Sequence, residues 1–126
     1  MGRTPLENTV VGKPVAEKGF NACHRFARIA PRKIRLVADL IRGMRVDEAL
    51  TALQFEKKRG AAFIIYVLKS AIANAEEKNA DASKLVVSES RIDEGPTIKR
   101  FQPKDRGRAF NIFKRTCHIH VAVSER

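Results

Sequence analysis

The sequence predicts an α+β domain in which three helices are followed by a long antiparallel hairpin. Its length of 126 residues is enough for one domain with one hydrophobic core. Apolar side chains recur at helical spacing between residues 31 and 78, and beyond residue 79 they alternate with polar ones as they do in strands. These three observations predict a flexible extension at residues 1–19 and a single domain at residues 20–126.

The first elements follow from local signals. Pro5, Gly12 and Pro14 are typical of a mobile N-terminal segment. A short strand is predicted from residue 20 to residue 29. Pro31 then suits the first position of a helix, where its missing N–H costs nothing, and Gly43 ends that helix. The apolar positions that define it are spaced i, i+3, i+4 and i+7: Ile34, Val37, Ala38 and Ile41.

Two more helices are predicted before the pattern changes. The second has Asp47 and Glu48 in its first turn, where the helix dipole favours acidic side chains. Its apolar positions are Val46, Ala49, Leu50 and Leu53. The third and longest runs from about Arg59 to Lys78 with a broad apolar stripe. We expect these helices to supply most of the core.

Two strands, about 84–94 and 109–124, are predicted to pair as a hairpin over about 84–124, with its tip near 98–108. Arms of this kind hold on the order of 19 residues each, or about 60 Å at roughly 3.3 Å per residue. Because a small core cannot cover that length, the middle of the hairpin must project from the domain. Gly95 and Pro96 mark the expected bend where it leaves.

The charge of the chain is concentrated in two segments. The net charge is +11, and residues 18–45 and 95–126 hold the excess, while residues 47–94 are slightly acidic. Charge for solubility alone would be spread more evenly, so the clustering indicates a polyanionic partner. No run of eighteen apolar residues is present, so we expect no membrane partner. The N-terminus has no apolar core of signal-peptide type, and we expect a cytoplasmic protein.

Three aromatic residues lie in the basic hairpin. Phe101, Phe110 and Phe113 could stack on splayed RNA bases. For Phe110 and Phe113, packing in the core is favoured over stacking on bases. For Phe101, core packing and base stacking are equally favoured. Gly107 indicates either a close backbone approach or an unusual dihedral, or else an ordinary turn.

Metal binding and catalysis have little support in the sequence. A zinc site could be imagined from Cys23, His24, Cys117, His118 and His120, but no C-x2-C or H-x3-H spacing is present. No phosphate loop, dinucleotide-binding motif or nucleophile elbow occurs either. We therefore expect no enzyme, no cofactor and no small-molecule substrate.

Three stretches of the chain resemble a known family. They are APRKIRLVADLIRGMRVDEAL (30–50), LKSAIANAEEKN (68–79) and EGPTIKRFQPKDRGRAFNIFKRTCHIHVAV (94–123). All three resemble the family of large-subunit ribosomal proteins whose bacterial member is called protein twenty-two. The resemblance implies three helices packed on a small three-stranded antiparallel sheet, with a long protruding β-hairpin. It implies a structural constituent of the large subunit that binds several domains of its rRNA, aids subunit assembly and lines the nascent-peptide exit tunnel.

The resemblance also implies site residues and partners. The residues expected to bind RNA are Arg28, Arg32, Lys33, Arg35, Lys99, Arg100, Lys104, Arg106, Arg108, Lys114, Arg115 and His118. Those expected at the tunnel-lining tip are Lys99, Arg100, Phe101, Gln102, Pro103, Lys104, Asp105 and Arg106. The implied partners are rRNA, neighbouring ribosomal proteins and the nascent peptide, in a cytoplasmic ribosome or, as the alternative, an organellar one. Cys117 and Asp105 depart from the family pattern, in which Ser or Thr and a basic residue are common.

A function of a different class is kept as the alternative. A nucleic-acid chaperone or an architectural DNA-binding protein could also insert a basic β-ribbon into a groove. An enzyme acting on RNA is a third class, but the sequence offers no candidate catalytic site for it.

Overall fold

The computed structural model describes residues 19–103 and 105–125. Of the extension predicted at residues 1–19, residues 1–18 lie outside the described residues, and Gly19 is the first residue of a strand. The helices and strands, in chain order, are β1 (Gly19–Ala27), α2 (Pro31–Ile41), α3 (Val46–Gln54), α4 (Gly60–Glu77), the 3-10 turn η2 (Ala82–Lys84), β2 (Leu85–Glu94), β3 (Ile98–Pro103), the 3-10 turn η3 (Asp105–Gly107), β4 (Ala109–Lys114) and β5 (Cys117–Glu125). The predicted α+β class is confirmed, and the three predicted helices are present close to their expected bounds.

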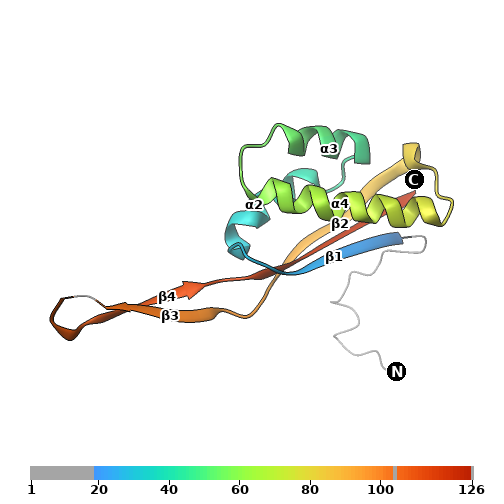
Figure 1. The fold of residues 1–126 in the computed structure, drawn as a ribbon. Coiled ribbons are helices and arrows are strands. Elements are labelled where there is room, and N and C mark those ends of the chain that lie inside the picture. The colour runs from blue at the N-terminus through green and yellow to red at the C-terminus, as the bar shows by residue number, and fades with distance from the viewer. Residues whose placement is uncertain (1–18, 104, 126) are drawn as a thin grey trace, which may run out of the picture.

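The strands form two separate sheets. β1, β5 and β2 make a three-stranded antiparallel sheet with β5 in the centre, while β3 and β4 pair only with each other. Figure 1 shows the helices on one side of the three-stranded sheet, with the β3–β4 ribbon extending away beyond them. The chain is thus a packed domain with a projecting two-stranded arm.

The core lies between the helices and one face of the sheet. Along β5 the burial alternates from residue 117 to residue 121, because successive side chains of a strand point to opposite faces. The largest fully buried side chains of the core are Ile34, Ile41, Leu53, Ile64, Leu68, Leu85 and Ile119. Within the parts of the chain that the structure describes, no helix is long and apolar enough to span a bilayer.

The predicted strand at 109–124 is in fact two strands. β4 ends at Lys114 and β5 begins at Cys117, with Arg115 and Thr116 between them. On the opposite arm, residues 95–97 separate β2 from β3. Unequal linkers, three residues against two, bend the paired arms at this point, much as a β-bulge bends a strand.

Tight contacts hold this bend. A Cβ atom on Gly95 would lie 2.6 Å from Thr116 Oγ1, so only glycine fits there without a shift. The Gly95 N–H donates to the Thr116 carbonyl oxygen at 3.0 Å, and the Thr116 hydroxyl donates to the Pro96 carbonyl oxygen at 2.6 Å. Because Thr116 is itself buried, the bend is a packed junction rather than a loose hinge.

The interpretation of Phe110 and Phe113 as core residues is wrong. Their side chains are 50% and 47% exposed, and Phe101 is 69% exposed. The ribbon extends beyond the described helices (Figure 1), and these three aromatic side chains on it are exposed.

Candidate nucleic-acid interface

The ribbon presents its side chains to solvent. Between Ile98 and Lys114 the described residues are all exposed except Ile98 and Ile112, which are half-buried. Phe101 pairs with Asn111 and Lys99 pairs with Phe113, so these four side chains share one face of the ribbon. That face therefore combines two aromatic rings with a cation.

The tip of the ribbon turns through two consecutive left-handed residues. Arg106 has φ 59° and Gly107 has φ +76°, and the Arg108 N–H donates to the Asp105 carbonyl oxygen at 3.2 Å. A Cβ on Gly107 would meet nothing within 4 Å, so the glycine serves the dihedral and not a close approach. Lys104, expected to bind RNA, lies outside the described residues.

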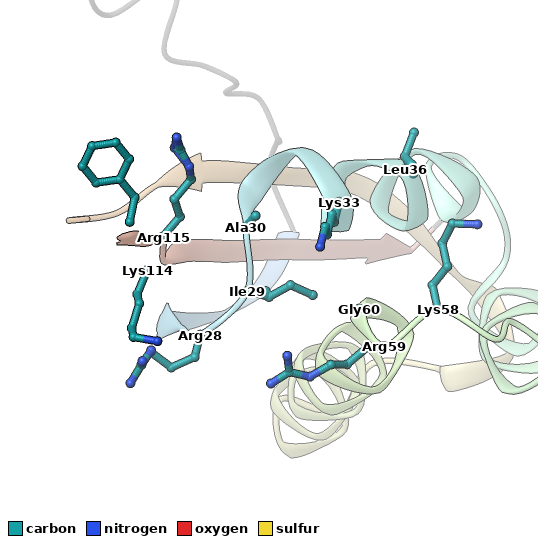
Figure 2. A pocket seen from close by; sticks show the side chains of 11 residues that line it. Arg28, Ile29, Ala30, Lys33, Leu36, Lys58, Arg59, Gly60, Lys114 and Arg115 are labelled. Carbon is teal, nitrogen blue, oxygen red and sulfur yellow. The ribbon is translucent and has the colours of Figure 1, made fainter. Parts of the chain in front are cut away.

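A basic groove lies where α2, the start of α4 and the base of the ribbon meet. It has a volume of about 800 Å³ and is lined by Arg28, Ile29, Ala30, Lys33, Leu36, Lys58, Arg59, Gly60, Phe113, Lys114 and Arg115. Figure 2 shows the cationic side chains around this hollow, coming from separate segments of the chain. Six lining residues are cationic and none is acidic, so the electrostatic potential of the groove favours an anionic partner.

A second hollow of about 700 Å³ continues the basic groove around the N-terminus of α2. The two share Ala30, Lys33 and Arg115, and the second adds Arg32 and Arg35. Glu94 is the single acidic residue that lines it. The dipole at the start of α2 adds to the attraction for anions here.

A tight helix contact brings Lys58 and Arg59 into the groove. A Cβ on Gly60 would lie 3.0 Å from Ile34 Cγ1, so glycine lets the first turn of α4 approach α2 closely. Lys58 and Arg59 are absent from the residues expected to bind RNA, because charge summed over residues 47–94 is slightly negative. The run KKRG at 57–60 was the signal that could have revealed them.

Two of the arginines on α2 and beside it also hold the fold together. Arg35 donates to the Ile92 carbonyl oxygen at 3.1 Å, and Arg42 donates to the Ser90 carbonyl oxygen. Arg42 also pairs with Asp39 at 2.9 Å. Arg35 is therefore a fold contact as well as a groove residue, although it is exposed, as Arg32 and Lys33 are.

His118 lies away from the basic groove, on the sheet face that the helices leave open. Its Nδ1 accepts a hydrogen bond from the Phe26 N–H at 3.0 Å. The two rings meet edge to face, with centroids 4.9 Å apart. His118 thus lines neither hollow of the basic groove, although its ring lies beside Gly95, which lines the second hollow.

The residues considered for zinc are split between the two faces of the sheet. Cys117 is buried in the core, whereas Cys23 Sγ lies 3.9 Å from His120 Nε2 on the open face. His120 Nε2 is also 3.2 Å from an Asp93 carboxylate oxygen. In residues 19–103 and 105–125 no group of three or more potential metal ligands comes together.

Burial is the main cause of the pKa shifts of His120 and Cys23 on the open face of the sheet. It lowers the pKa of His120 below its usual range, and Arg91 acts in the same direction, outweighing the attraction of Asp93. Burial also raises the pKa of the Cys23 thiol. A thiol held in its protonated form is a poor nucleophile and a poor metal ligand.

Comparison with known proteins agrees with this architecture. The family model of ribosomal protein L22p/L17e matches residues 22–124. Large ribosomal subunit protein uL22 of Magnetococcus marinus is 52% identical over 103 residues, covering 81% of this chain and 91% of that protein. The proteins of the same name from Clostridium novyi and Desulfosudis oleivorans are each 46% identical over 106 residues, covering 83% and 84% of this chain and 96% and 93% of their own lengths. This chain therefore belongs to the ribosomal protein L22p/L17e family.

Proposed function

We propose that this ribosomal protein is a structural constituent of the large subunit, without enzymatic activity, that binds large-subunit rRNA through its basic groove and its ribbon. Family membership supports the ribosomal role. The observation that carries RNA binding is the groove itself, where six cations from three segments converge with no acidic residue among them.

The physical argument rests on uncompensated charge. Clustered cations repel one another in the free protein, and the salt bridges that the described residues form at Asp39, Glu89 and Asp93 lie outside the groove. Among the described residues, Lys58 is the one groove cation with an acidic partner, Glu56, at 3.8 Å. Phosphates of an rRNA backbone would offset this repulsion and release their counterions.

The ribbon supports a second part of the proposal. A two-stranded ribbon is marginal by itself in water, and this one has exposed aromatic and basic side chains but no cover from the domain. It would gain its cover from rRNA, with the tip lining the nascent-peptide exit tunnel. The proposed partners are therefore several rRNA domains, neighbouring ribosomal proteins and the nascent peptide, in cytoplasmic ribosomes. Contacts with several rRNA domains would also aid assembly of the subunit.

The test is the salt dependence of binding to a transcript of large-subunit rRNA. Replacing Lys58 and Arg59 with Ala should reduce the slope of log affinity against log salt by about 1 for each phosphate that the variant no longer binds. The matched control replaces Lys69 and Lys84 with Ala, because both are exposed and line neither hollow of the groove.

Equal slopes for the two double variants would remove the groove from the interface. Cosedimentation with large subunits in high salt then tests the ribosomal role. A pool found free or bound to DNA would favour the architectural DNA-binding alternative.

A further inference from the structure

The pairing of β1 with β5 is interrupted by a β-bulge. The register is regular up to His24 and resumes at Ala27. The two residues between them, Arg25 and Phe26, therefore lie opposite the single residue His118. Bulges of this kind re-aim side chains and are frequent beside functional sites.

Phe26 holds an unfavourable backbone conformation at the bulge. Its φ is 61°, in the left-handed region that bulky side chains rarely adopt. The hydrogen bond from its N–H to His118 and the edge-to-face ring contact stabilise it there. A glycine would reach the same φ without strain, so the phenylalanine ring itself calls for an explanation.

The domain leaves much of this ring uncovered. Phe26 is 54% exposed, on the face of the sheet opposite the helices. The guanidinium carbon of Arg25 lies 5.5 Å from the ring centroid, within the range of a cation–π contact. An exposed aromatic surface beside a cation is the arrangement that single-stranded nucleic acids use for stacking.

We propose that Phe26, with Arg25 beside it, is a stacking site for an unpaired base of rRNA. The proposal rests on the proposed function, that this chain binds rRNA, and adds a contact outside both the basic groove and the ribbon. Stacking supplies an apolar partner for the ring, and Arg25 supplies a cation for the phosphate or the base face.

The charges around the ring favour RNA over a protein partner. Asp93, which lies opposite His118 in the pairing of β2 with β5, already pairs with Arg91 at 2.8 Å and lies 3.2 Å from His120. Arg28, which lines the basic groove, is two residues from Phe26, so their Cα atoms lie within about 7 Å. One RNA strand can therefore place a phosphate at Arg28 and a neighbouring base on Phe26.

The first experiment compares two substitutions in binding to a transcript of large-subunit rRNA. Phe26→Leu keeps an apolar side chain but loses the π face, and it should weaken binding roughly 5- to 150-fold, the range expected when one stacked base is lost. Phe26→Tyr keeps the π face and should retain wild-type affinity. Because stacking involves no phosphate, the salt slope of Phe26→Leu should equal that of the wild type.

Thermal unfolding checks that both variants are folded. Wild-type affinity in a folded Phe26→Leu variant would overturn the stacking site and leave the groove unaffected. Failure of the wild-type chain to bind rRNA would instead remove the proposed function and this site together.

A second measurement needs no variant. Ultraviolet irradiation of native large subunits should link Phe26 to a nucleotide, which mass spectrometry of the digested peptide detects. A crosslink from Phe26 to a protein, or none at this residue, would overturn the proposal.

Discussion

The two halves of the hairpin have the same strand pairing but opposite surroundings. In the β2–β5 half, Leu85, Ile119 and Val121 are at most 1% exposed, because helices cover that face. In the β3–β4 half, the exposed fractions of Phe101 and Phe110 are 69% and 50%. Pairing alone therefore does not decide whether a strand is part of a core; the cover does. Within the described part of the chain, no helix packs on the ribbon. Its cationic side chains indicate that the partner that packs on it is a polyanion.

The largest effect expected is from truncating the core of the packed half. Leu68→Ala should lower the free energy of unfolding by about 2–5 kcal/mol, because Leu68 is completely buried and a cavity would remain. The matched ribbon change, Arg108→Ala, should alter stability by less than about 0.5 kcal/mol and weaken rRNA binding. Denaturant unfolding of both variants measures this contrast. Comparable losses of stability would show that the ribbon packs on the domain.

A smaller loss is expected at the junction between the halves. Gly95→Ala should cost roughly 1–3 kcal/mol, because the added Cβ would clash with Thr116 Oγ1. Thr116→Ala removes that oxygen, so the double variant should be more stable than the sum of the single losses predicts. A double-mutant cycle by thermal unfolding tests this coupling. Strict additivity would mean that the close approach does not constrain the bend.

The smallest effect on stability is expected from removing the outer ribbon. Lys99 pairs with Phe113, so residues 100–112 can be replaced by Asn-Gly, a favoured two-residue hairpin turn. The free protein should melt close to the wild-type temperature, because none of the removed residues that the structure describes is buried. Incorporation into large subunits should persist through the groove. A collapse of the melting temperature would contradict the division into a packed half and a projecting half.

Helices and chain order could be predicted from the sequence because they depend on local periodicity and on signals such as Pro31 and Gly43. The division of residues 109–124 into two strands could not, because the bend depends on contacts of Thr116 with residues 95 and 96 across the hairpin. Exposure of Phe110 was missed because apolar character does not tell what covers a side chain.

The candidate site shows the same limit. The basic character of the first helix and of the ribbon was visible in the sequence. The addition of Lys58 and Arg59 depends on the close approach of Gly60 to Ile34, a tertiary contact that no local pattern encodes. The β-bulge at Phe26 depends likewise on its pairing with β5.

The junction at Gly95 and Thr116 makes the ribbon a cantilever clamped at one end. β3 alone has six residues, or about 20 Å at roughly 3.3 Å per residue. A rotation of about 10° at the clamp would displace the far end of such a lever by about 3–4 Å, more than the length of a hydrogen bond. The hydrogen bonds of the buried Thr116 therefore help to fix the direction of the ribbon at the end opposite its tip. Substitutions at Gly95 or Thr116 would therefore weaken contacts of the ribbon tip, although neither residue takes part in those contacts.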